Sequence, residues 1–133
     1  MNEIKWEFSE ELEKEDLLDD FETEYAYRLP HDLKELIKNH NGGVPNKPVF
    51  DRPRKGMVLS NLLSFQQNGE ETVYMVIDNF RLNGTIEMLP FATDGFGNMI
   101  CCKKGAIVFW NHETNQVENI ADSLGAFLEM LHE

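Results

Sequence analysis

The chain has 133 residues, of which 24 are Asp or Glu and 12 are Lys or Arg, so its formal net charge at pH 7 is −12. Its hydrophobic fraction of 41% indicates a globular protein with one core and excludes a disordered tail. The negative charge disfavours direct binding to nucleic acid or to an anionic membrane surface, and it favours encounter with a basic protein. Solubility alone is the other explanation of such acidity.

The N-terminal half of the chain predicts two helical regions. Residues 1–24 are acidic with interspersed apolar side chains, which predicts one or two amphipathic helical turns. Residues 29–43 carry an apolar stripe at helical spacing, which predicts a helix followed by an Asn-Gly-Gly stop. Pro30 suits the first helical position, and Asn41, Gly42 and Gly43 can adopt the left-handed conformation that ends a helix.

The middle of the chain gives weaker signals. Residues 44–55 contain three prolines and predict a loop or an edge segment. Residues 56–65 predict a short strand followed by a helical turn around Asn61 to Phe65. In "EETVYMVIDNF" (residues 70–80) the apolar positions have helical spacing, so we expect a helix there despite the β-branched residues.

The last third of the chain changes to short apolar segments. Residues 85–112 contain such segments separated by "TDGFG" and "KKG", which predicts antiparallel strands joined by tight turns. An apolar stripe from Ile120 to Leu131 predicts a closing helix over residues 121–132, with Asp122 or Ser123 as its cap. Helices, then strands, then a helix predict one α+β domain over residues 1–133, with a small, mostly antiparallel sheet packed against N-terminal and C-terminal helices.

The segment "TDGFGN" (residues 93–98) is the strongest candidate for a ligand-binding loop. No helix follows it and no Gly-Lys-Ser/Thr is present, so it fits neither a dinucleotide nor a P-loop fingerprint. Its oxygen ligands do not alternate as an EF-hand requires. An Asp-Gly pair between apolar strands is instead typical of a hairpin turn. We therefore interpret Asp94, Gly95, Gly97 and Asn98 as structural residues.

Other chemical signatures are weak. The histidines are scattered and lie in no HExxH array, and the adjacent Cys101 and Cys102 have neither disulfide geometry nor zinc-site spacing. No GxSxG elbow is present. The sequence thus predicts no catalytic, cofactor-binding or metal-binding residues, although a metal site built from distant residues stays open.

Two phrases together carry a family resemblance. "LPHDLKELIKNHNGG" resembles the signature of the SUKH superfamily (the Smi/Knr-type domain), and "LPFATDGFGNMICC", "AIVFWNHE" and "IADSLGAFLEML" resemble its second half in the same order. The resemblance implies an α+β fold without a catalytic centre. It also implies that bacterial members are often cytoplasmic immunity proteins that neutralise toxin domains, frequently nucleases, whereas fungal relatives are regulatory interaction proteins.

The resemblance and the charge together predict a non-enzymatic immunity protein that binds a cognate basic toxin through its acidic surface. The absence of a basic n-region followed by an apolar h-region predicts a cytoplasmic location. A regulatory or scaffolding module, and a small enzyme or metal-binding protein, are the alternatives; oligomeric state is not predicted. Trp6 could be either a lid over the core or an exposed anchor. The candidate partner-binding residues are Trp6, Glu10, Glu11, Asp19, Asp20 and Glu24, with a merely solvated helix face as the alternative for each acid.

Overall fold

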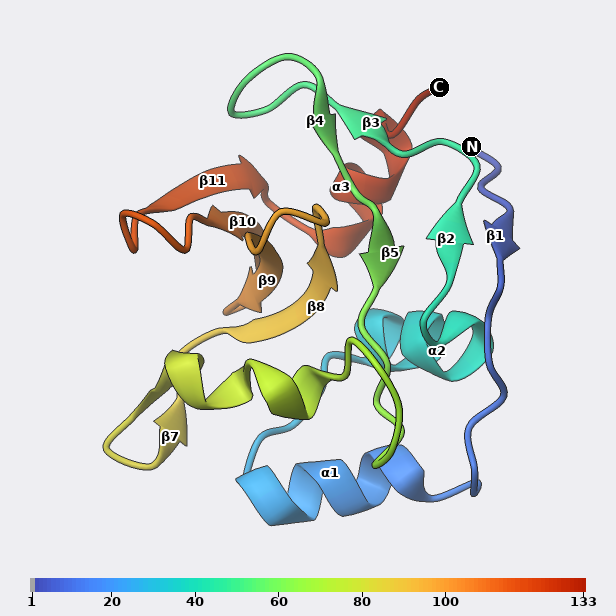
Figure 1. Ribbon diagram of the computed structural model, residues 1–133, viewed down its shortest axis with the longest axis vertical. Coiled ribbons are helices and arrows are strands. Elements are labelled where there is room, and N and C mark those ends of the chain that lie inside the picture. Colours follow the sequence, from blue (N-terminus) through green and yellow to red (C-terminus); the bar gives the residue numbers. More distant parts are fainter. Residues whose placement is uncertain (1) are drawn as a thin grey trace.

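The computed structural model describes residues 2–133 and has an α+β fold, as the sequence predicts. Within these residues the largest sheet has five antiparallel strands in the order β11-β10-β9-β8-β5. These strands are β5 (Asn61–Leu62), β8 (Leu89–Thr93), β9 (Met99–Lys103), β10 (Ala106–Trp110) and β11 (Val117–Ala121). In Figure 1 this sheet extends from the red-orange β11 on the left to its other edge strand, the green β5, near the centre of the view.

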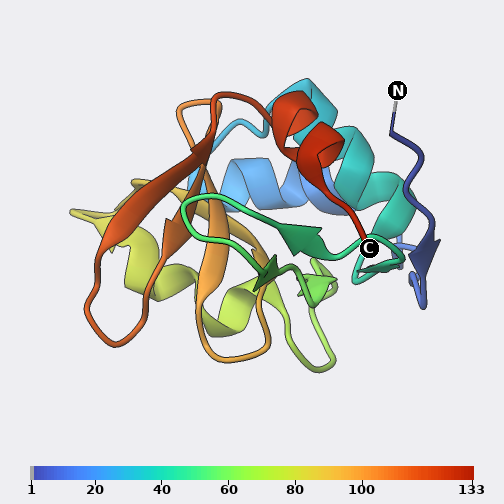
Figure 2. The ribbon, with the colours of Figure 1, turned by 90° about the horizontal axis from the view of Figure 1, so that it is seen from above.

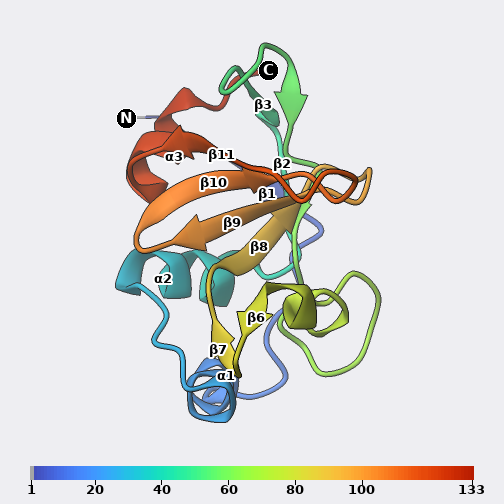
Figure 3. The same cartoon turned by 90° about the vertical axis from the view of Figure 1, so that its left-hand side faces the viewer.

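Short paired strands and three helices complete the described residues. The strand pairs are β1 (Trp6–Glu7) with β2 (Val44–Pro45), β3 (Val49–Phe50) with β4 (Met57–Val58), and β6 (Arg81–Leu82) with β7 (Thr85–Ile86). The α-helices are α1 (Leu17–Tyr25), α2 (His31–His40) and α3 (Leu124–Met130). In Figure 3, α2 and α3 lie toward one end of the strands, and turns 94–98 and 111–116 and loop 66–72 lie toward the opposite end. Figure 2 shows α1, α2 and α3 gathered on the side away from β5.

The core explains why the central strands are apolar runs instead of alternating patterns. All five residues of β8 are buried. Phe127 of α3 lies 6.5 Å from Phe91, ring centroid to ring centroid, and Phe80 lies 4.8 Å from Trp110 in an edge contact. Because other elements cover the sheet, no polar face is needed along these strands.

The segment from residue 61 to residue 80 differs from its prediction. Residues 61–65 contain strand β5 and no helical turn, because the Leu62 N–H donates to the Gly43 carbonyl and the Leu63 N–H donates to the Phe91 carbonyl, each at 2.8 Å. Residues 70–80 form two short 3-10 helices, η1 (Val73–Met75) and η2 (Ile77–Phe80), in place of one α-helix. Their β-branched residues disfavour a longer α-helix.

Two helix termini also differ from expectation. The closing helix begins at Leu124 instead of residue 121, because Ala121 still belongs to strand β11 and pairs with Ile107 of β10. Ser123 caps this helix, accepting a hydrogen bond from the Ala126 N–H at 3.1 Å. Pro30 occupies the N-cap of α2 instead of its first turn, with an extended ψ of 143°.

Candidate partner-binding groove

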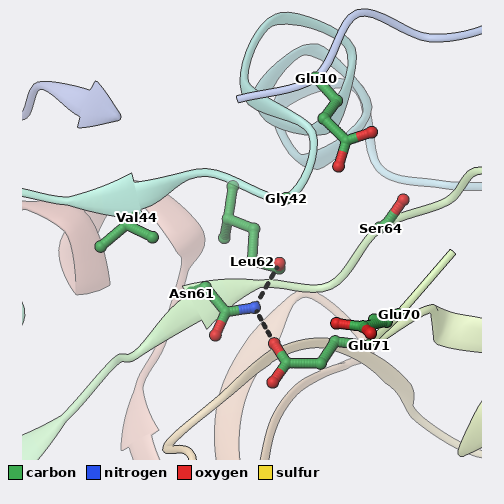
Figure 4. Close-up of a pocket in the computed structure, with 8 residues that line it drawn as sticks. All are labelled: Glu10, Gly42, Val44, Asn61, Leu62, Ser64, Glu70 and Glu71. Atoms are coloured by element: carbon green, nitrogen blue, oxygen red, sulfur yellow. Dashed lines mark hydrogen bonds between the residues drawn. The ribbon is translucent and has the colours of Figure 1, made fainter. Parts of the chain in front are cut away.

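An acidic pocket opens between the N-terminal segment, the end of α2, strand β5 and loop 66–72 (Figure 4). Its volume is about 500 Å³. Its lining includes the carboxylates of Glu10, Glu70 and Glu71, together with Asn61, Ser64 and Gly42. No Lys, Arg or His is among the described residues that line it. We call this site the acidic pocket.

The wall of the acidic pocket at the end of α2 is built by the Asn-Gly-Gly motif, in which each residue has a separate task. Asn41 is 1% exposed; its Nδ2 donates to Ser64 Oγ at 3.1 Å and its Oδ1 accepts from the Phe65 N–H at 2.8 Å. Gly42 takes the left-handed conformation, with φ 71°, whereas Asn41 has φ −49°. A Cβ at Gly43 would lie 2.9 Å from the His40 carbonyl oxygen, so that position needs glycine for close approach. Of the three residues, only Gly42 is left-handed.

Gln66 fixes the N-terminal acidic segment next to loop 66–72. Its buried amide Nε2 donates to the Glu11 carbonyl at 2.6 Å, and its Oε1 accepts from the Glu13 N–H at 3.0 Å. The Glu10 N–H in turn donates to the Asn41 carbonyl at 2.9 Å. The two Gln66 bonds join segments more than fifty residues apart in sequence, and together with the Glu10 bond they bring Glu10 to the same pocket as Glu70 and Glu71.

Glu71 is the carboxylate that the fold holds most firmly in the pocket. Its Oε2 accepts from Asn61 Nδ2 at 2.8 Å, and its carbonyl accepts from the Ser64 N–H at 3.1 Å. Its φ of 51° lies in the left-handed region, which a residue with a Cβ rarely adopts.

On the other side of the loop, burial raises the pKa of Tyr74 to about 12. Its hydroxyl therefore stays protonated and donates to the Phe65 carbonyl at 3.0 Å.

The turn from Asp94 to Asn98 satisfies its own polar groups. Asp94 Oδ1 accepts from the N–H groups of Phe96 and Asn98, and Asp94 Oδ2 accepts from Asn98 Nδ2 at 2.8 Å. Asn98 Oδ1 accepts from the His112 N–H at 3.0 Å, which joins the turn to residues 111–116. Gly97 has φ 93°, and a Cβ there would lie 3.0 Å from the His112 ring. This carboxylate is occupied within the turn, and Phe96 between the two glycines is 79% exposed.

The predicted partner-binding acids are dispersed. Only Glu10 lines the acidic pocket. On α1, Asp19 pairs with Lys34 at 2.7 Å and Asp20 pairs with Lys14, so both are already neutralised within the chain. Glu24 is exposed on the same helix, and Glu11 is exposed on the N-terminal segment.

The predicted aromatic anchor, Trp6, is half-buried. Its ring stacks on His40 with 5.8 Å between centroids, and burial lowers the pKa of that histidine. This packing favours the lid over the anchor. Phe8, two residues later, is 79% exposed and has φ 59°, so it is the aromatic residue that the N-terminal segment presents to solvent.

The sequence analysis did not select two acids that line the acidic pocket, Glu70 and Glu71. It also did not select two exposed apolar side chains, Phe8 and Met75. "NGEE" indicates a polar turn, and two adjacent acids in a turn are a local signal that could have been followed. Their meeting with Glu10 depends on the Gln66 hydrogen bonds, which no local pattern predicts.

The described residues offer little for metal or thiol chemistry. Residues 2–133 contain no group of three or more His, Cys, Asp or Glu side chains placed to hold a metal ion. Burial raises the pKa of the Cys101 thiol well above its ordinary value, and burial also raises that of Cys102. Both thiols are therefore held in their unreactive protonated form.

The chain is thus a small α+β domain with an open acidic pocket and a turn, Asp94 to Asn98, whose polar groups bond one another. Its sequence matches the profile of the SMI1 / KNR4 family (SUKH-1) over residues 13–130, and the chain belongs to this family. A search of curated proteins found no significant match. Among residues 2–133, no helix combines the length and apolar character that crossing a bilayer requires.

Proposed function

We propose that this protein is a non-enzymatic, cytoplasmic immunity protein that binds a cognate toxin domain and neutralises it. Membership of the SUKH family, which is associated with immunity proteins, supports the class of function. The acidic pocket, with three carboxylates and no basic residue in its described lining, is the observation that supports binding of a basic partner.

The mechanism is charge complementarity. A nuclease toxin must hold phosphates, so its cleft is basic, and a surface with net charge −12 both attracts that cleft and can cover it. Attraction between opposite potentials raises the association rate and favours basic partners over acidic ones. Glu10, Glu11 and Glu24 contribute to this field, whereas Asp19 and Asp20 contribute less because Lys34 and Lys14 pair with them.

Stoichiometric blocking needs no chemistry from the immunity protein. The Asp94 carboxylate, which would be the first candidate for a catalytic group, accepts three hydrogen bonds from its own turn. The buried thiols lack the lowered pKa of a nucleophile. These observations support a binding protein over a small enzyme.

Growth rescue tests this function. The product of the open reading frame beside the gene, as the candidate toxin, is induced in a sensitive host with and without this protein, and we expect growth under induction only when this protein is co-expressed. A matched control replaces this chain with an unrelated acidic protein of similar charge. Growth that fails to recover would contradict the proposal, and a regulatory or scaffolding module would give that result.

A further inference from the structure

An apolar slot adjoins the acidic pocket. Its volume is about 250 Å³, and Glu71 lines both cavities. Leu63, Val76 and Met99 form apolar walls, and Gly95 and Gly97 of the turn form another side. Met75 stands at this slot with 71% of its surface exposed. A single exposed apolar side chain is common on protein surfaces, and here it extends the apolar lining of the slot to solvent.

The two cavities have complementary chemistry. The pocket is lined by carboxylates, whereas the slot is mostly apolar, and no Lys, Arg or His lines either of them within residues 2–133. The slot is smaller than the usual 300–1,000 Å³ of a small-molecule site, so it suits a single side chain better than a metabolite. Protein interfaces commonly place such an apolar contact beside a charged rim.

We propose that the acidic pocket and the apolar slot together receive one loop of a basic protein partner, with a Lys or Arg side chain in the pocket and a neighbouring aliphatic side chain in the slot. This inference rests on the proposed function and assigns the contact surface to the groove instead of helix α1. Side chains two positions apart on an extended segment point to the same side, which lets both enter adjoining cavities. Phe96, exposed on the turn between the slot residues Gly95 and Gly97, is a further apolar side chain available to the partner.

The recognition chemistry is tested with synthetic peptides. The probe is an acetylated, amidated pentapeptide of sequence GRALG, titrated into the labelled protein while amide and methionine-methyl resonances are followed. We expect shifts at the Asn61 side-chain amide and the Met75 and Met99 methyls. Peptides GQALG and GRASG, which lack the charge or the aliphatic group, should bind at least about fivefold more weakly, because each loses one contact. Equal binding of the three peptides, no binding, or shifts centred on α1 would overturn the inference.

Surface variants test the same inference with the toxin domain. Met75→Ser and Glu70→Lys change exposed side chains, and Leu82→Ser and Glu35→Lys are the matched exposed controls elsewhere on the surface. We expect each groove variant to weaken binding of a catalytically inactive toxin domain by about tenfold or more, with both controls near wild type. Thermal unfolding confirms that each variant is folded.

The outcomes separate the two proposals. If the wild-type protein rescues growth and the groove variants bind the toxin domain as wild type does, the surface assignment is wrong and the function stands. If the wild-type protein does not rescue growth, the function is wrong, and the peptide titration still decides whether the groove recognises a basic-aliphatic segment.

Discussion

Replacing Asn41 with Ala should destabilise the fold more than any exposed polar substitution. Asn41 is buried and connects the end of α2 to the segment that follows β5 through two side-chain hydrogen bonds. The substitution leaves the buried Phe65 N–H without its acceptor, which costs about 1–3 kcal/mol. Ser64 Oγ loses a donor but still accepts from the Gln66 N–H at 3.1 Å. The loss of unfolding free energy at Ser64 is therefore smaller, about 0.5–1 kcal/mol. We expect a total loss of about 1.5–4 kcal/mol.

Urea unfolding followed by tryptophan fluorescence measures this loss. With a slope of about 2 kcal/mol per molar urea, the midpoint should fall by about 0.75–2 M. Amide hydrogen exchange at Phe65 should accelerate in the same variant. Asn39→Ala is the matched control, because Asn39 lies exposed on the same helix, and it should change stability by less than about 0.5 kcal/mol. An equally small loss for Asn41→Ala would refute the assignment of this residue as the connection between the pocket walls.

Three further predictions concern other parts of the chain. Asp94→Ala should lower the free energy of unfolding by about 1–3 kcal/mol in urea titrations, because the N–H groups of Phe96 and Asn98 lose their acceptor; unchanged stability would contradict the structural interpretation of this turn. The hydrogen bond that His132 Nε2 donates to Asp51 Oδ2 raises the pKa of His132, so the stabilisation of the C-terminal residues by this pair is fully present below about pH 6.5 and is lost as the pH rises through the folded-state pKa. NMR titration of the His132 ring checks this, and an Asp51→Asn variant should return its pKa toward the ordinary value. Finally, Cys101 and Cys102 should resist a thiol reagent at pH 8 in the native protein and react once it is unfolded in urea; fast native labelling would show that the thiols are accessible.

The sequence correctly predicted the elements that are specified by residues close together in the chain. The apolar stripe that ends in Asn-Gly-Gly specified helix α2, and the alternation of apolar runs with glycine-containing turns specified strands β8 to β10. In both cases the hydrophobic periodicity and the turn residues indicate the same element, so a short window of sequence is sufficient to predict it.

Elements that depend on distant partners were mispredicted. Ile120 lies four positions before Leu124, so it fitted the apolar stripe of the following helix, although it belongs to strand β11. Strand β5 forms because Leu62 and Leu63 find backbone acceptors at Gly43 and Phe91, far away in sequence. Tertiary pairing overrides local propensity in such segments.

The candidate site divides in the same way. The net charge predicts a basic partner, and the individual carboxylates could not be ranked from sequence because acids are so numerous. Asp19 and Asp20 were chosen, and the fold pairs both with lysines. Glu70 and Glu71 become prominent only because the buried Gln66 side chain holds loop 66–72 against the N-terminal segment.

The salt dependence of association tests the central claim most directly. Stopped-flow mixing of this protein with the catalytically inactive toxin domain, from about 20 mM to about 500 mM NaCl, should show the association rate constant falling by about tenfold or more, because salt screens the attraction between the acidic groove and the basic cleft. The dissociation rate constant should change far less. An association rate constant that stays flat across this range would contradict recognition through the acidic surface.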